Sequence, residues 1–414
     1  MRLVLIHQYF WPDPPPYASM LRAIAADLGR RGHDVRVLAG RAGASTTTGA
    51  PTAASRAPRR VVVDGVSVER LPQVSGRGLR QAVNLVVFPA VVAARVLTGR
   101  RADVVMCSTA PQVTLGAFVS LAARARRSRF VYHCMDLHPE IGRLSGEFAN
   151  PITYRLLARI DAATMRRASA VVVLSEDMAR SVASRDPALS DKVVVLNNFA
   201  LPQFGDTVEA PLPAPEPGVL RVVFTGNLGR FQGLEDLVAA VRTLPDAVRV
   251  ELVFMGDGVV GPELERAGAE LADGPVRIVL VPRGPVALAR ALMRTAHVGV
   301  VSLVLGVVAY AYPSKVATYA EEGLPILAVV EPGSELARTV EDRGLGWTAA
   351  PGDIVGIAAA LVSAYENLVS DPSFAAVRDR VRRYATAEFA QDRALPRWAA
   401  LVDAVTGSHP LADV

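Results

Sequence analysis

One stretch of the sequence, residues 312–325, combines the side chains and turn signals of a phosphate-binding loop. It reads YPSKVATYAEEGLP and lies between two apolar segments typical of strands. Pro313 suits the first turn of a helix, where its missing N–H would have no partner, and Gly323 suits the helix end. The pattern therefore places Ser314 and Lys315 at a predicted helix N-terminus, where free N–H groups and the helix dipole favour an anion.

Lysine is rare in this chain, which makes Lys315 a candidate for a specific role. Only Lys192 and Lys315 are lysines, while the other 43 of the 45 basic residues are arginine. A compact ammonium group at this position, with the Ser314 hydroxyl beside it, favours a phosphate contact. The alternative is an ordinary helix start with no ligand.

Three further loops carry candidate binding residues. Residues 226–233, GNLGRFQG, hold three glycines that would let a ligand approach the backbone, and Arg230 could contact a diphosphate; a plain tight turn is the alternative. In residues 331–335, EPGSE, Ser334 is either an anion contact or a helix N-cap. Residues 133–140, HCMDLHPE, suit acid–base chemistry or hydroxyl binding, with structural hydrogen bonding as the alternative; a metal site is not favoured, since this histidine spacing is no standard ligand pattern.

The order of apolar segments predicts two α/β domains. Short apolar strands alternate with helices, which indicates doubly wound parallel sheets. A segment with five prolines, residues 201–219, is the expected linker. We therefore predict domains over residues 1–200 and 220–390, with a final helical segment over 391–414 that packs back on the first domain.

Charge and cysteine content set the expected surroundings. Residues 1–200 contain 27 basic and 14 acidic residues, while the remainder contains 18 and 26, so the first domain is expected to meet an anionic partner. Two cysteines and the lack of a signal-peptide pattern favour a cytoplasmic location. Residues 81–97 form either a buried helix or a helix at the inner face of a membrane, with flanking arginines on anionic headgroups.

Taken together, these motifs resemble those of a known enzyme family over nearly the whole chain. GNLGRFQGLE at 226–235, PSK at 313–315, GLP at 323–325 and DLHPE at 136–140 look like the retaining GT-B glycosyltransferases of family four. The similarity is greatest to the branch that includes bacterial O-antigen and capsule amino-sugar transferases. HQYFWPD at 7–13 and LGRRGHDV at 28–35 fit the same family.

The resemblance implies two Rossmann-like domains facing across a cleft, a UDP-sugar donor similar to UDP-GlcNAc, and no metal cofactor. The donor-binding residues that it implies are Gly226, Asn227, Gly229, Arg230, Gln232, Tyr312, Ser314, Lys315, Thr318, Ser334 and Glu335. On the acceptor side it implies Asp136, His133 and His138 as catalytic residues, with Tyr17 and Glu140 contacting a small-molecule or lipid-linked acceptor.

The sequence also departs from the family pattern. Tyr310 and Thr318 stand where many members carry two glutamates, Met135 replaces a histidine, and Gln232 replaces a lysine, as is usual in this branch. Two other functions therefore remain open, a sugar-nucleotide epimerase and a partner protein without catalysis. A nucleic-acid binder is not favoured, because the first domain lacks an aromatic and basic recognition element.

Overall fold

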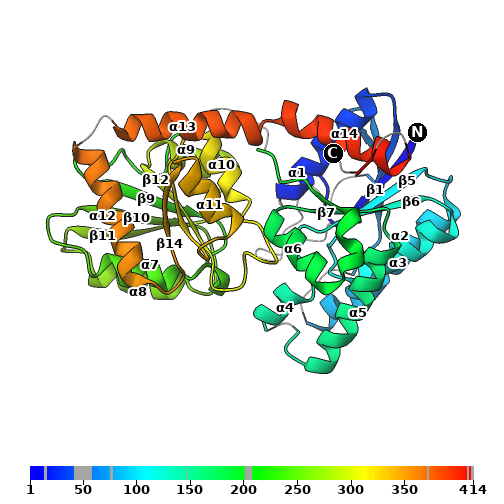
Figure 1. Ribbon diagram of the computed structural model, residues 1–414, viewed down its shortest axis with the longest axis horizontal. Helices are drawn as coiled ribbons and strands as arrows, with labels where there is room; N and C mark the ends of the chain where they lie inside the picture. The colour runs from blue at the N-terminus through cyan, green and yellow to red at the C-terminus, as the bar shows by residue number, and fades with distance from the viewer. Residues whose placement is uncertain are drawn as a thin grey trace. The chain divides into compact units, whose positions relative to one another are not determined.

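The computed structural model describes residues 1–13, 16–41, 58–74, 78–146, 148–200, 208–370, 373–407 and 410–411. Two compact units make up the chain (Figure 1). The first contains Met1–Leu201, Tyr310–Tyr312 and Gln391–Val414, and the second contains Pro202–Ala309 and Pro313–Ala390. Residues 42–57, a segment rich in Ala, Thr and Ser, and residues 201–207 of the expected linker lie outside the described residues.

The first unit is built on an eight-stranded sheet with the order β3-β4-β2-β1-β5-β6-β7-β8. Its strands are β1 (Arg2–His7), β2 (Asp34–Gly40), β3 (Arg60–Val63), β4 (Val66–Leu71), β5 (Val104–Ser108), β6 (Arg129–His133), β7 (Ala170–Val173) and β8 (Val193–Val195). All neighbours pair in parallel except β3 and β4, which form an antiparallel hairpin around Asp64-Gly65, a dipeptide typical of such turns. Both turn residues have positive φ, 51° and 80°, as that hairpin turn requires.

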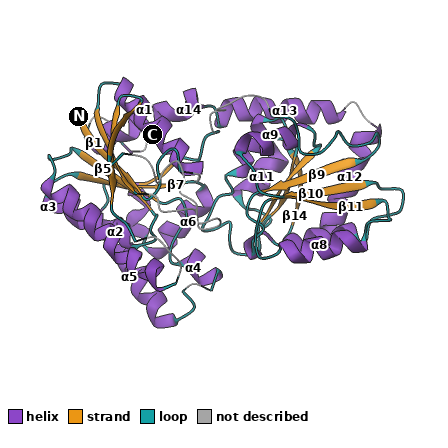
Figure 2. Ribbon diagram, turned by 180° about the vertical axis from the view of Figure 1, so that it is seen from behind, coloured by secondary structure: helices purple, strands orange, loops and turns teal. Residues whose placement is uncertain are grey.

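Helices cover the sheet of the first unit. They are α1 (Pro16–Arg30), α2 (Leu79–Thr98), α3 (Thr114–Ala125), α4 (Glu140–Leu144), α5 (Pro151–Arg167), α6 (Glu176–Arg185), the 3-10 helix η1 (Pro187–Lys192) and α14 (Gln391–Val405). Figures 1 and 2 show α2, α3 and α5 side by side, away from α1 and α14. Trp398 and Leu401 of α14 are buried in the same core as α1 and β1, which confirms the predicted return of the C-terminal helix.

The second unit contains a six-stranded parallel sheet with the order β11-β10-β9-β12-β13-β14. Its strands are β9 (Leu220–Thr225), β10 (Val250–Met255), β11 (Val276–Val281), β12 (Val298–Ser302), β13 (Ile326–Val329) and β14 (Gly346–Ala349). Its helices are η2 (Arg230–Gln232), α7 (Leu234–Val241), α8 (Gly261–Glu270), α9 (Val286–Arg294), α10 (Lys315–Glu321), α11 (Glu335–Asp342), α12 (Ile354–Ser370) and α13 (Ser373–Glu388). Two parallel α/β sheets in two domains confirm the predicted fold class.

The strand order brings the candidate loops to one edge of each sheet. Parallel strands share their carboxyl ends, and loops at that edge are the usual ligand sites of doubly wound sheets. In the second unit the loops after β9, β12 and β13 carry the predicted donor residues, and in the first unit the loop after β6 carries Asp136.

Among the described helices, none by itself is both long and apolar enough to span a membrane. The bent pair Ile354–Val369 and Phe374–Val405 meets that criterion by length and composition only.

Candidate active site

Lys315 points at the glycine-rich turn of the second unit. Its Nζ lies 3.5 Å from the ring centroid of Phe224, and a Cβ atom built on Gly226 would lie 3.8 Å from the same nitrogen. Burial lowers the pKa of Lys315 to about 7. No carboxylate pairs with this amine among the described residues, so a positive charge here is held only by the face of an aromatic ring.

The turn after β9 is held in place by backbone contacts. The Gly226 N–H donates to the Met255 carbonyl, and the Leu228 N–H donates to the Asp257 carbonyl, both at 2.9 Å. A Cβ atom on Gly256 would come within 1.7 Å of the Gly226 carbonyl oxygen, so glycine is required for this approach. The two loops after β9 and β10 therefore form one rigid base beside Lys315.

Tyr319 of α10 supports the same turn from below. The Thr225 N–H donates to the Tyr319 hydroxyl oxygen at 3.0 Å, and the tyrosine ring is fully buried. Neither Tyr319 nor Gly256 was singled out in the sequence. For Gly256, the sequence signal is Gly256-Asp257-Gly258 directly after a predicted strand.

The other predicted residues of this turn differ in exposure. Asn227 and Arg230 are exposed, and Gly229 is buried between Asn227 and Gln232, where a Cβ atom would lie 2.6 Å from Asn227 Nδ2. The Gln232 Oε1 atom is buried and has no hydrogen-bond partner among the described residues. The turn therefore offers an exposed guanidinium and an unused amide oxygen.

The segment before Lys315 differs from the sequence prediction. Helix α10 begins at Lys315, two residues later than expected, because the Val316 N–H donates to the Pro313 carbonyl in a turn before the helix. Ser314 is exposed at the N-cap position, and its hydroxyl makes no cap hydrogen bond. Thr318 is partly buried within the helix, and Tyr312 is buried and belongs to the first unit.

In the loop after β13, Ser334 is a helix cap. Its hydroxyl accepts a hydrogen bond from the Ala337 N–H at 3.2 Å, at the start of α11. Of the two alternatives for Ser334, an anion contact or a helix N-cap, the structure shows the N-cap. Glu335 is the first residue of α11 and is partly buried.

Two unused polar groups lie at the ends of β12 and β13. The Glu331 carboxylate accepts from the Gly306 N–H, but its Oε2 atom is buried without a partner among the described residues, as is the Ser302 hydroxyl. Ser302 was not a sequence candidate, and Glu331 was noted only as part of its loop. Both are suitable acceptors for sugar hydroxyl groups.

In the first unit, Asp136 lies at the carboxyl edge of the sheet. It pairs as an antiparallel bridge with Ala311, and the neighbouring Leu137 N–H donates to the Tyr310 carbonyl at 2.8 Å. Burial raises the pKa of Asp136 to about 6. A carboxyl group in such surroundings can hold or exchange a proton near neutral pH.

His133 and Tyr17 lie in the core, beneath this edge. They are 1% and 3% exposed, and the Tyr17 hydroxyl lies 2.7 Å from His133 Nδ1. The His133 ring packs at 4.9 Å from Trp398, and burial lowers the pKa of His133 to about 3. Both side chains therefore support the loop from inside, and the substrate contacts that the resemblance implied for them stay predictions.

Glu140 is already engaged by a buried arginine. Arg185 forms ion pairs with Glu140 and, at 2.9 Å, with Asp161. His138 is 7% exposed, and burial, with Arg185 nearby, lowers its pKa to about 4. The Glu140 carboxylate therefore ties this loop to Arg185 of α6, and its expected contact with an acceptor stays a prediction.

Within the part of the chain that the structure describes, no group of three or more His, Cys, Asp or Glu side chains gathers as a metal site.

Two Rossmann-like units with these loops at their sheet edges define a GT-B protein. Residues 17–198 match the model of the glycosyl transferase 4-like domain, and residues 220–367 match that of the glycosyl transferases group 1. A protein of Pseudomonas aeruginosa, probable glycosyltransferase WbjE, is 30% identical over 290 residues, which cover 68% of this chain and 70% of that protein. The chain belongs to the group 1 glycosyltransferases of family four, a retaining family.

Solved structures agree on the fold. A sucrose-phosphate synthase from Thermosynechococcus elongatus has a TM-score of 0.70 at 16% identity, covering 99% of this chain and 100% of that one. Anabaena HepE in complex with UDP has a TM-score of 0.65 at 16% identity, covering 98% and 100%. WaaG, a glycosyltransferase involved in lipopolysaccharide biosynthesis, has a TM-score of 0.63 at 15% identity, covering 98% and 100%.

Proposed function

We propose that this glycosyltransferase moves a sugar from a UDP-sugar, UDP-GlcNAc-like in its sugar, to a hydroxyl or amine acceptor with retention of configuration. The acceptor is a small molecule or a lipid-linked sugar. Structures of HepE in complex with UDP and with UDP-glucose support the choice of nucleotide, since HepE shares the fold over 98% of this chain.

Lys315 is the observation that carries the proposal. An amine that is partly buried and has no protein carboxylate beside it, among the described residues, is poised to meet an anion from outside the protein. The adjacent glycine turn lets phosphate oxygens approach the backbone of Gly226, and Arg230 at the next turn adds a second positive charge.

These groups can stabilise a diphosphate leaving group. As the bond between the anomeric carbon and the phosphate oxygen breaks, negative charge grows on the diphosphate, and Lys315 and Arg230 stabilise it. The departing phosphate oxygen takes the acceptor proton while the acceptor oxygen or nitrogen bonds to the anomeric carbon on the same face. Asp136 orients the acceptor group, and Ser302 and Glu331 accept hydrogen bonds from donor hydroxyls.

Binding and turnover test the proposal separately. Calorimetry is expected to show binding of UDP and much weaker binding of uridine, because the diphosphate supplies the contacts. Release of UDP from UDP-GlcNAc should depend on an added acceptor. Conversion of the donor to an epimer without any acceptor would instead establish the epimerase, and absence of UDP binding would overturn the proposed donor.

A further inference from the structure

Most of the described exposed side chains of α2 are apolar. Its exposed large side chains are Val83, Val86, Val87 and Leu97, with exposed fractions of 42%, 53%, 37% and 42%. The helix contains two charged residues, Arg80 in its first turn and Arg95 near its end. A helix face of this kind is unusual in contact with water, where polar residues normally cover the outward side.

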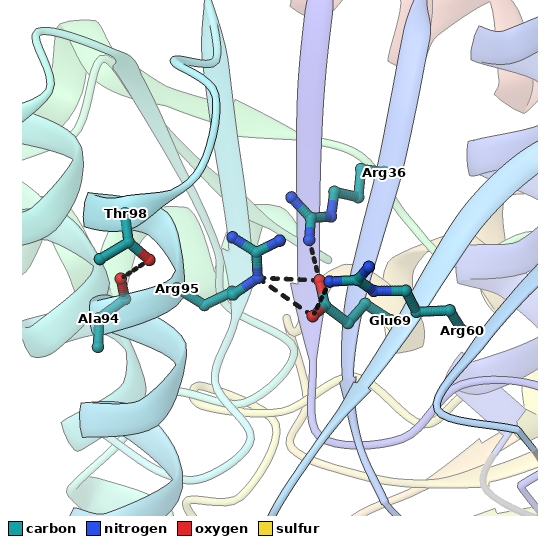
Figure 3. Close-up of polar contacts among 6 residues, drawn as sticks. All are labelled: Arg36, Arg60, Glu69, Ala94, Arg95 and Thr98. Carbon is teal, nitrogen blue, oxygen red and sulfur yellow. Dashed lines mark hydrogen bonds and ion pairs between the residues drawn. The ribbon is translucent and has the colours of Figure 1, made fainter.

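Arg95 shows that the orientation of α2 is fixed. Its guanidinium donates to both carboxylate oxygens of Glu69 in β4, at 3.1 and 3.0 Å. Figure 3 shows Arg95 reaching toward Glu69, where Arg36 and Arg60 also converge, while Ala94 and Thr98 lie on the other side of the helix. Since Glu69 is buried, this cluster holds the charged side of α2 against the sheet and leaves the apolar side outward.

Two neighbouring helices also carry exposed large apolar side chains. Helix α2 packs against α3, and α3 packs against α5, as Figures 1 and 2 show. Leu121 of α3 is 54% exposed, and Ile152 and Leu156 of α5 are 75% and 56% exposed. We call this surface the α2–α3–α5 face; its apolar members are Val83, Val86, Val87, Leu97, Leu121, Ile152 and Leu156.

Every exposed charge on these three helices is positive. Exposed arginines that pair with no carboxylate among the described residues are Arg80, Arg124, Arg155, Arg159 and Arg167. The one acidic residue in the three helices is Asp161, which is 1% exposed and bonded to Arg185. Apolar side chains flanked by unpaired arginines match a surface that is apolar inside and anionic outside.

We propose that the α2–α3–α5 face docks the first unit on an anionic lipid bilayer, with its apolar side chains at the boundary of headgroups and acyl chains and its arginines on lipid phosphates. A second copy of the chain fits this face poorly, because two-fold pairing would bring the same arginines together. The docking involves no residue of the proposed donor site, so it can hold or fail independently of the nucleotide.

Vesicle flotation tests the docking. At low salt the full chain is expected to float with vesicles of phosphatidylcholine containing about one third phosphatidylglycerol, to stay behind with pure phosphatidylcholine, and to be released by high salt. Replacing Arg155 and Arg159 by Gln should lower the partition coefficient about 30-fold, since each arginine near such a surface contributes about fivefold. Val86→Glu with Leu156→Glu should abolish flotation.

Matched controls lie on the second unit. Val355 of α12 is 79% exposed, and Val355→Glu should float like the parent, as should Arg277→Gln with Arg283→Gln, both exposed arginines. Unchanged melting temperature and UDP affinity would show that the face variants are folded. The proposal is overturned if the parent does not float, if the face variants float as well as the parent, or if light scattering shows a dimer that Val86→Glu dissociates.

Discussion

At the scale of single residues, Lys315 is the side chain that can be tested most directly. A charged group that is partly buried is ordinarily accompanied by an opposite charge, and here an aromatic ring stands in that place. If Lys315 contacts a diphosphate, the substitution Lys315→Ala removes one charge-assisted contact of about 1.5–3 kcal/mol, and UDP affinity should fall about ten- to a hundredfold. Calorimetry with UDP measures the loss.

Lys192 is the matched control for this substitution. It is the other lysine, and its ammonium donates to the carbonyls of Arg166 and Ala168 in the first unit. Lys192→Ala should leave UDP affinity unchanged, and Lys315→Arg should restore it only in part. Arg230→Ala and Lys315→Ala should be non-additive if both side chains contact the same phosphates. Parent-like UDP binding by Lys315→Ala would remove this residue from the donor site.

The pKa of Lys315 predicts a proton uptake on binding. With a pKa of about 7, the amine is largely neutral at pH 8, and a diphosphate beside it raises that pKa. Binding of UDP at pH 8 should therefore take up a proton, whereas binding at pH 5.5, where the amine is already charged, should take up none. Calorimetry in two buffers of different ionisation enthalpy measures this, and Lys315→Met should abolish it.

The lowered pKa of Lys315 also makes the free energy of unfolding depend on pH. The pKa of Lys315 is lower in the folded protein than its ordinary value of 10.5, so the unfolded chain binds more protons between about pH 7 and pH 10.5. Without ligand, this residue alone therefore makes the free energy of unfolding rise with pH over that range. The difference in pH dependence between the parent and Lys315→Met isolates this contribution, and identical curves would contradict the shift.

Asp136 is a second residue that can be tested by itself, and its proposed contact is with the acceptor. Asp136→Asn keeps the size of the side chain and removes its charge, so turnover should fall while UDP affinity stays nearly unchanged. Glu176→Gln, on the exposed surface of α6, is the control for removal of one carboxylate from the first unit. An equal loss of UDP affinity in Asp136→Asn would place this residue with the donor instead.

At the scale of elements, the loops after β9 and β10 depend on each other for their conformation. Gly256 adopts a φ of 157°, and a Cβ atom there would collide with the Gly226 carbonyl. Gly256→Ala should lower the free energy of unfolding by about 2–4 kcal/mol, by overpacking and backbone strain, and should weaken UDP binding through the displaced turn. Gly274→Ala, where the nearest atom would be 3.7 Å away, is the control. Thermal denaturation and calorimetry together would disprove the coupling if Gly256→Ala behaves like the control.

Some of these elements could be predicted from sequence and others could not. Long apolar strands such as β9 and β10, the Asp64-Gly65 hairpin and the glycine turn carry strong local patterns. The three-residue strand β8 and the strand β14, with its Trp and Thr, carry weak patterns from which a strand cannot be predicted. The ion pair of Glu140 with Arg185 joins residues 45 positions apart, and the cap at Ser334 depends on its side-chain direction, so neither follows from spacing.

At the scale of the whole molecule, charge is divided between the two halves of the chain. Residues 1–200 carry the positive excess, and the α2–α3–α5 face shows part of it as unpaired surface arginines. The second unit is acidic in composition, yet the described side chains around the proposed diphosphate site include Lys315 and Arg230. An acidic unit that binds an anion therefore depends on a few placed cations and not on its net charge.

That dependence leads to the last prediction, which concerns metal ions. A transferase neutralises its diphosphate leaving group either with a divalent cation held by carboxylates or with protein cations. The described residues contain no group of three or more His, Cys, Asp or Glu side chains that could hold such an ion, whereas Lys315 and Arg230 can supply the charge themselves. UDP-sugar turnover should therefore be the same in EDTA as in Mg²⁺ or Mn²⁺. The Lys315→Ala variant should lose turnover equally in both conditions, and full loss of parent activity in EDTA, restored by either ion, would show that a metal carries the charge instead.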